Sequence, residues 1–202
     1  MAASGLGTAE LLYGWRKPDD AVVDLAFRRI EEALRLNSRS DMLHVAHALL
    51  LLFARRRYRE SAAASRRALE FNSEYNMALW SLGAVQVFEG EVDAGAASAM
   101  RAVNIDIRDP YVHLYSRIAA YGHLEAGRYG EAIDWFQRAD QLAPGVLPNL
   151  EGLAVSRWLE GDETGARDAV SRLLQEEPEF RLRERQPRVR FLETLRLAGA
   201  SN

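Results

Sequence analysis

The sequence predicts an all-α protein, a right-handed α-solenoid of about five antiparallel helix pairs closed by a C-terminal capping helix. A 34-residue spacing recurs along the 202-residue chain, and small residues recur at three fixed positions within that spacing. No stretch alternates polar and apolar residues with the period of two that marks a half-buried strand. Because repeats of this length stack on their neighbours, we expect a single domain over residues 1–202.

The spacing divides most of the chain into repeats of 34 residues, each long enough for two helices and their turns. A three-residue insertion, Pro110-Tyr111-Val112, accounts for one larger offset of 37 residues. The first repeat is degenerate, and Pro187 opens the predicted cap. The repeats cover residues 7–40, 42–75, 76–109, 113–146 and 147–180, and the cap covers 187–198.

Small side chains stand where the two helices of each pair should cross. Two helices that pack closely need small residues at the crossing, since larger side chains would hold the backbones apart. Thirteen of the 15 residues at repeat positions 8, 20 and 27 are Gly, Ala or Ser. These positions hold Gly14, Leu49, Gly83, Ala120 and Ala154, then Ala26, Ser61, Gly95, Ala132 and Ala166, and then Ala33, Ala68, Ala102, Ala139 and Leu173.

The turns set the helix boundaries. Glycine stands between the two helices of three repeats, and proline follows the second helix of two, as helix ends favour. The turn glycines are Gly90, Gly127 and Gly161, and the prolines are Pro144 and Pro178. The first helices of the pairs, the A helices, are predicted at about 8–15, 42–54, 76–88, 111–126 and 147–159, and the second, the B helices, at about 19–36, 58–71, 92–104, 129–142 and 163–176.

Composition argues against several classes of function. Cysteine is absent and Lys17 is the single lysine beside 25 arginines, so thiol, Schiff-base and P-loop chemistry find no support. His44 and His47 stand three residues apart, but no third ligand is near, so we expect no metal site. We likewise expect no cofactor and no catalytic activity from this chain.

Charge and hydropathy argue against nucleic acid and membranes as partners. The net charge is -3, and residues 76–180 alone carry 8 basic and 17 acidic groups, a net charge of -9. The longest apolar run, near residues 45–54, is too short to span a bilayer. The first ten residues lack the features of a secretory signal, so we expect a soluble, cytoplasmic protein.

The A helices should line a concave groove, because stacked helix pairs place them on the inner surface. The groove positions are rich in Trp, Tyr, Phe and Met, which are enriched in binding hot spots. A protein or peptide is therefore the predicted partner, and Trp80, Tyr121 and Trp158 are the strongest candidates. The predicted groove residues are Leu43, His47, Leu50, Met77, Trp80, Phe88, Leu114, Arg117, Tyr121, Glu151, Val155 and Trp158, with Phe53 beside them.

Three alternatives to a free groove stay open on the sequence. The aromatic residues could pack between neighbouring A helices, or the groove or an open end of the solenoid could form a homodimer. A clamp for a C-terminal carboxylate is disfavoured, because only Arg117 approaches the required basic pattern. The arginines of residues 181–190 could contact an acidic partner or phosphates, although pairing with the acidic central repeats is the simpler interpretation.

Four segments resemble known repeat proteins. Gly127-Arg-Tyr-Gly-Glu-Ala-Ile-Asp-Trp-Phe-Gln-Arg-Ala139 resembles the second helix of a tetratricopeptide repeat (TPR). The Asp109-Pro110 insertion, the segment Pro178-Glu-Phe-Arg-Leu-Arg183 and the segment Arg190-Phe-Leu-Glu-Thr-Leu-Arg-Leu-Ala-Gly199 resemble the TPR region of bacterial class III adenylate cyclases. Similar repeat regions follow winged-helix transcriptional regulators of the CadC type.

The resemblance implies a regulatory or oligomerising module of a bacterial signalling protein such as an adenylate cyclase. In those families the catalytic or DNA-binding domain precedes the repeats, so we expect the chain to be an excised repeat region or a free-standing relative. A standalone adaptor that binds a peptide in its groove is the first alternative. The second alternative is that the parent protein is an adenylate cyclase by virtue of an N-terminal catalytic domain that this chain lacks.

Overall fold

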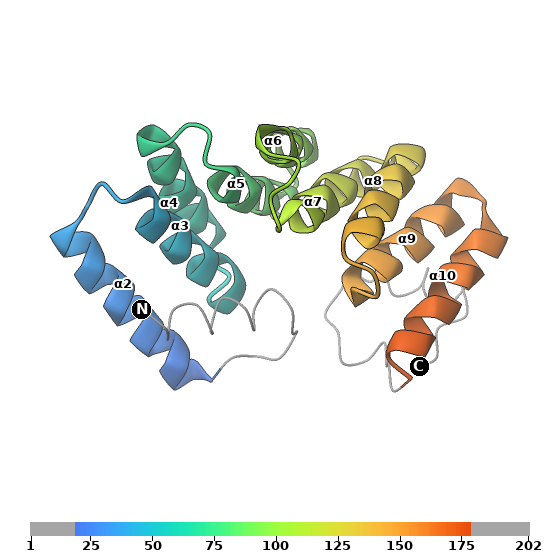
Figure 1. Cartoon of the computed structure of the whole chain (residues 1–202), viewed down its shortest axis with the longest axis horizontal. Coiled ribbons are helices and arrows are strands. Elements are labelled where there is room, and N and C mark those ends of the chain that lie inside the picture. The colour runs from blue at the N-terminus through green and yellow to red at the C-terminus, as the bar shows by residue number, and fades with distance from the viewer. Residues whose placement is uncertain (1–18, 179–202) are drawn as a thin grey trace. The chain divides into compact units, whose positions relative to one another are not determined.

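The computed structural model describes residues 19–178, which form nine α-helices and one short π-helix with no strand among them. The all-α prediction is confirmed. The chain divides into two compact units, residues 1–106 and 107–202, each built from helices that pack against their neighbours in sequence (Figure 1). The predicted helix at 8–15 and the cap at 187–198 lie outside the described residues, and a single right-handed superhelix stays a prediction.

The first unit contains five of the α-helices. They are α2 (Asp20–Leu36), α3 (Asp41–Leu49), α4 (Tyr58–Phe71), α5 (Asn76–Glu89) and α6 (Val92–Ile105). Their ends agree with the predicted ranges to within one or two residues, with one difference at the end of the helix predicted at 42–54. There the last turn is a π-helix, η1 (Leu50–Ala54), in which the Arg55 N–H donates to the Leu50 carbonyl at 3.2 Å.

The second unit contains α7 (Val112–Glu125), α8 (Tyr129–Leu142), α9 (Leu147–Glu160) and α10 (Glu163–Glu176). These four helices also match the predicted pairs. Phe136 of α8 lies in the middle of one apolar core with residues of α9 and α10, among them Leu150, Val170 and Leu173. Burial of each such side chain stabilises the folded state by about 1.5–3 kcal/mol. Packing between the pairs therefore stabilises helices that would be marginal alone.

The two helices of the second pair in the first unit cross at glycine. A Cβ atom on Gly83 of α5 would lie 2.8 Å from the carbonyl oxygen of Gly95 in α6. A Cβ atom on Gly95 would lie 2.8 Å from the Gly83 oxygen and 2.6 Å from Val87. These are repeat positions 8 and 20, so the small residues there act as the sequence predicts: they let two backbones approach.

Contacts between successive repeats use different pairs of side chains at equivalent positions. In the first unit, Ser65 of α4 and Ser81 of α5 share a buried hydrogen bond of 2.5 Å between their hydroxyl groups. In the second unit, Phe136 of α8 fills the space beside Gly152 of α9, where any Cβ atom would collide with the ring. One contact is small and polar, and the other joins a large ring to a bare backbone.

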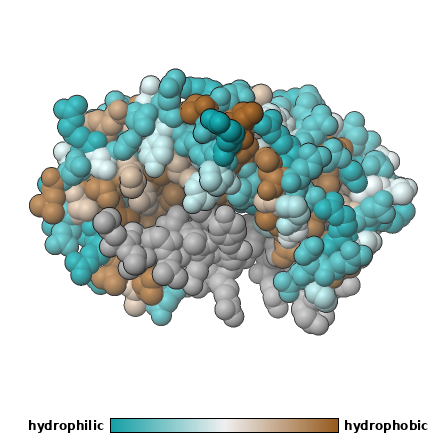
Figure 2. All heavy atoms as spheres, viewed as in Figure 1, coloured by the Kyte–Doolittle hydropathy of each residue, from teal (hydrophilic) through white to brown (hydrophobic). Residues whose placement is uncertain are grey.

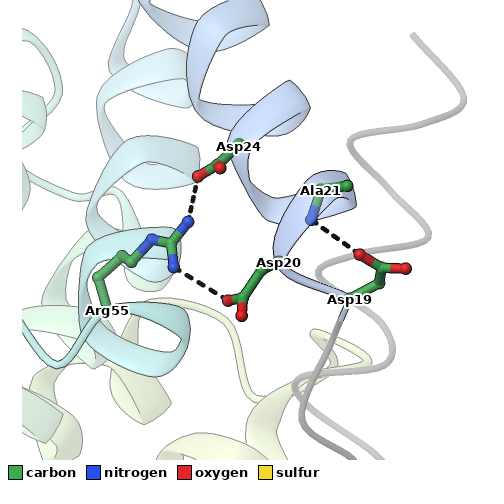
Figure 3. A network of polar contacts seen from close by, with 5 residues as sticks. All are labelled: Asp19, Asp20, Ala21, Asp24 and Arg55. Carbon is green, nitrogen blue, oxygen red and sulfur yellow. Dashed lines mark hydrogen bonds and ion pairs between the residues drawn. The ribbon is translucent and has the colours of Figure 1, made fainter.

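One arginine ties α2 to the rest of its unit (Figure 3). The Arg55 guanidinium, directly after η1, donates to Asp20 at 3.1 Å and also pairs with Asp24 one turn further along α2. Asp19 caps the same helix by accepting a hydrogen bond of 2.8 Å from the Ala21 N–H. The first turn of α2 is therefore held by a cap and by a two-carboxylate arginine contact.

Arg56 occupies the turn position that glycine holds in the other described pairs. Gly90, Gly127 and Gly161 end their A helices with φ angles of 91°, 77° and 96°. Arg56 stands at the same repeat position with a φ of 53°. A non-glycine residue pays about 1–2 kcal/mol in this left-handed region, so the first unit keeps a strained turn between α3 and α4.

We predict that Gly83→Ala destabilises the protein by about 1–3 kcal/mol, because the added methyl group must push α6 away from α5. Gly130→Ala is the matched control, since a Cβ atom there meets only the Glu160 carboxylate, at 3.9 Å. The control should be neutral or stabilising by up to about 1 kcal/mol through higher helix propensity. Thermal unfolding followed by circular dichroism measures both changes. Equal melting temperatures for the two variants would contradict the close approach of α5 and α6 at Gly83.

We predict that Arg56→Gly is neutral to stabilising, by up to about 1 kcal/mol, because relief of the left-handed strain exceeds the extra chain entropy of glycine. The reciprocal variant Gly161→Arg should lose about 1–2 kcal/mol. No atom lies within 4 Å of a Cβ at Gly161, so that loss would come from the backbone alone. A lower melting temperature for Arg56→Gly would show that the arginine side chain contributes more than its strain costs.

Candidate functional site

All twelve predicted groove residues lie on A helices or their last turn. Three belong to α3 and η1, three to α5, three to α7 and three to α9. The structure thus gathers six of them on helices of the first unit and six on helices of the second. Because each unit is compact in itself, the A-helix face of each unit is treated as a separate candidate surface.

Burial divides the twelve residues into two groups. Leu50, Trp80, Leu114, Glu151 and Val155 are buried, and Trp80 exposes only 1% of its surface. The partly exposed residues are Leu43, His47, Met77, Arg117, Tyr121 and Trp158, and Phe88 is 45% exposed. Trp80 is therefore a core residue in this structure, and a partner would contact the partly exposed side chains first.

Two pairs of aromatic rings stack on each other in the first unit. Phe53 stacks on Trp80 with ring centroids 5.8 Å apart, and Tyr58 stacks on Phe88 at 5.9 Å. Such pairs add about 0.5–1.5 kcal/mol beyond the burial of their area. The A-helix face of the first unit is consequently stabilised by its own aromatic contacts, and Met77 and His47 are its partly exposed predicted residues beside Leu43.

In the second unit, two partly exposed aromatic side chains pack against the apolar core. Tyr121 of α7 lies edge-on to the Phe136 ring at 5.0 Å, and its hydroxyl donates to the Pro148 carbonyl of α9 at 3.3 Å. Trp158 of α9 packs against the same core, and the Arg167 guanidinium lies 5.8 Å from its ring centroid. Both rings are thus positioned before a partner arrives, which lowers the entropy cost of binding.

Charge on the second unit's A-helix face comes from both signs. Arg117 of α7 is partly exposed, whereas Glu151 of α9 is only 5% exposed. Burial lowers the pKa of His113, and the Arg117 guanidinium lowers it further, so His113 favours its neutral form. The face therefore carries the partly exposed guanidinium of Arg117 one turn before Tyr121 on α7, a combination suited to a polar peptide.

In residues 19–178, no three His, Asp or Glu side chains come together where they could bind a metal ion. None of the helices formed by these residues is long and apolar enough to cross a membrane. The arginine-rich segment 181–190 lies outside the described residues.

Solved structures with the same architecture identify the repeat type. PilW, a type IV pilus biogenesis factor, superposes with a TM-score of 0.74 at 15% identity, over 91% of this chain and 82% of PilW. PilF of Pseudomonas aeruginosa gives 0.73 at 16% identity, over 90% and 78%. YrrB, a TPR protein with an unusual peptide-binding site, gives 0.62 at 16% identity, over 84% and 90%.

The chain has the tetratricopeptide-repeat fold. At these identities the TPR neighbours establish the architecture alone, and the chemistry of the site must come from its own residues. No protein-family model matches the sequence, and no curated protein matches it either. The TPR prediction is confirmed at the level of the fold, whereas the resemblance to cyclase and CadC-type regions stays a prediction.

The repeat pattern predicts the A-helix face, but it does not predict the side chains that hold Tyr121 in place. Phe136 and Pro148, which hold Tyr121, are not groove positions. Phe136 falls at repeat position 24, where the equivalent residues of the other repeats are Ile30, Ser65, Ala99 and Val170. Its large ring at a position of smaller residues is the signal that could have indicated a special contact there.

We predict that acidification destabilises the first unit through His47. Burial is the main cause that lowers the His47 pKa, against an opposing effect from Glu31, and its ring lies edge-on to Phe27 at 5.7 Å. The unfolded chain, with a His pKa near 6.5, then binds the proton first, so stability present above pH ~6.5 is lost as the pH falls below it.

Titration of the His47 ring by nuclear magnetic resonance (NMR) should give a midpoint below 6.5, the ordinary pKa of histidine. Melting temperatures at neutral and mildly acidic pH should differ less in His47→Gln than in the unsubstituted chain. A midpoint at or above the ordinary histidine pKa would contradict burial as the dominant effect.

Proposed function

We propose that this chain is a protein–protein interaction module that binds a peptide or a helix of a partner on the A-helix face of its second unit. The observation that supports this most is the pair Tyr121 and Trp158, which are partly exposed and held by the core behind them. Rigid aromatic side chains of this kind contribute most of the binding energy in many interfaces. Arg117, one turn before Tyr121 on α7, would add a contact to a carboxylate or a backbone carbonyl of the partner.

The peptide-binding site of YrrB supports the same class of ligand, since that protein shares the fold at a TM-score of 0.62. Tyr121 and Trp158 come from different helix pairs, so a bound segment would span two repeats of the second unit. The A-helix face of the first unit, with Met77 and Phe88, is the secondary surface of this proposal. Binding to nucleic acid, membrane or a cofactor is not part of it.

The finer proposal is that the module regulates or oligomerises a bacterial signalling protein such as a class III adenylate cyclase, in the cytoplasm. It rests on the insertion at Asp109-Pro110 and on the sequence that follows Pro178. A standalone adaptor is the alternative, and it would use the same surface on a partner in trans. A homodimer would place the A-helix face of one copy against another and would appear in light scattering across concentrations.

The test uses peptides selected by display on the immobilised full chain and then titrated by fluorescence polarisation. We expect Trp158→Ala to weaken a selected peptide at least tenfold, because an aromatic anchor is lost. Tyr111→Ala is the matched control, since Tyr111 is an exposed aromatic residue of the same unit at the start of α7. Circular dichroism verifies that both variants keep their helices.

Equal losses in both variants, or no loss in Trp158→Ala, would contradict the proposed surface. An assay of the purified chain for cyclic nucleotide formation separates the module from an enzyme, and metal-dependent turnover would overturn the proposal of a non-catalytic role.

A further inference from the structure

A second surface of the first unit lies away from the A-helix face, at the ends of the B helices. Leu36, Phe71 and Ile105 are the last residues of α2, α4 and α6. Their spacings of 35 and 34 residues place them at one repeat position. Equivalent positions of stacked pairs lie along the same side of a repeat array, so these residues follow the edge where one repeat passes to the next.

This edge, called the inter-repeat edge below, exposes apolar side chains that the fold does not cover. Leu36 is 87% exposed, Met42 at the start of α3 is 67% exposed and Ile105 is 38% exposed. In Figure 2, brown atoms mark the margin of the molecule where α2 ends, beside a mostly teal outer surface. Each such residue alone is unremarkable, but several at one edge mark a surface for a partner.

Phe71 anchors the middle of the inter-repeat edge. The Arg67 and Arg39 guanidiniums lie 4.6 Å and 5.7 Å from its ring centroid, and the His44 ring stacks on it at 5.7 Å. The Asn72 amide next to it donates to the Asp41 carboxylate at 3.1 Å, which joins the end of α4 to the start of α3. Leu36, Met42 and Phe71 therefore belong to segments held together at one corner of the unit.

The edge continues into a depression beyond Phe71. A hollow of about 330 Å³ is lined by Glu74, Arg101, Asn104 and Ile105. It offers a guanidinium and an amide, which can pair with a ligand carboxylate, beside the Glu74 carboxylate and an exposed aliphatic side chain. Glu74 is three residues after Phe71, so the hollow and the Phe71 corner lie on one continuous edge.

Cations are in excess along the inter-repeat edge. Within the described residues, no ion pair involves Arg35, Arg39 or Arg101, whereas Arg67 pairs with Glu70. Glu74 has no ion pair there either, and Asp41 accepts its hydrogen bonds from Asn72 and the Met42 N–H. Three guanidiniums without an ion pair in the described part of the chain thus stand against two carboxylates without one, Asp41 and Glu74, so the edge keeps an excess of positive charge and favours a ligand with negative charge.

We propose that the inter-repeat edge of the first unit binds an acidic, apolar peptide segment of a protein partner. The apolar side chains of that segment contact Leu36, Met42 and Phe71. Its carboxylates pair with Arg39 and Arg101. This surface is separate from the A-helix face and does not depend on the function proposed for that face. A module with both surfaces would join two partners, or would bind one partner at two places.

The chain carries its own reporters for the two surfaces. Of its four methionines, Met42 lies on the inter-repeat edge, Met77 on the A-helix face and Met100 on α6. Labelling the methionine methyl groups with carbon-13 gives one NMR signal for each, and Met42→Leu and Met77→Leu assign the first two. A peptide that binds the edge must shift the Met42 signal, whereas one on the A-helix face must shift Met77.

The probe is a short synthetic peptide in which Glu alternates with Leu and Phe, titrated into the full-length labelled chain. We expect the Met42 signal to move to saturation while the Met77 signal stays in place, and added salt to weaken the binding. The double variant Arg39→Glu and Arg101→Glu should weaken binding at least tenfold. The matched control, Arg59→Glu and Arg66→Glu on the exposed face of α4, changes the same charge away from the edge.

Four outcomes would overturn the proposal. They are an unmoved Met42 signal, a shift of Met77 without Met42, equal losses in the two double variants, and undiminished binding when Lys replaces Glu in the peptide. The second outcome would leave the function proposed for the A-helix face intact, so the two proposals fail separately. Circular dichroism verifies that both double variants remain folded.

Discussion

The close approach of two helices within each pair is the constraint on which the rest of the structure depends. It favours glycine, alanine or serine at the crossing, which hold 13 of the 15 crossing positions, and in the α5–α6 pair Gly83 and Gly95 leave no room for a Cβ atom. Once the backbones are this close, larger residues must lie on the flanks of the pair. Those flanks pack against the next pair on one side and form the A-helix face and the exposed B-helix face on the others.

The two proposed surfaces follow from that arrangement and differ in character. On the A-helix face of the second unit, Tyr121 and Trp158 rest on the core and are stiff. At the inter-repeat edge of the first unit, Leu36 and Met42 are exposed, and charge is supplied by arginines around Phe71. A rigid aromatic surface selects by shape, whereas a basic apolar edge selects by charge and tolerates variation in sequence.

Most of the helices could be predicted from the sequence because the same helix–turn–helix pattern recurs in each repeat. The turn glycines and the small crossing residues recur at fixed positions, and the described helices end where these residues predict. Burial could not be predicted in the same way, since repeat position assigns a face but not its neighbours. Trp80 shows this, because Phe53 stacks on it and almost none of its surface is exposed. Nothing in the apolar sequence of Leu50–Ala54 predicts that this turn is a π-helix. The arginine at position 56, where other repeats have glycine, is visible in the repeat alignment.

A chain of similar repeats must also avoid assembling them in the wrong order, which is a common failure of repeat proteins. The contacts between repeats carry the information that prevents it. Phe136 fits only against a residue without a side chain, which Gly152 supplies, and Ser65 needs the hydroxyl of Ser81. Exchanging these partners would force the Phe136 ring into Ser81 and leave an empty space beside Gly152. The side chains at repeat positions 24 and 6 thus differ in volume between these two contacts, and each contact fits only its own partner.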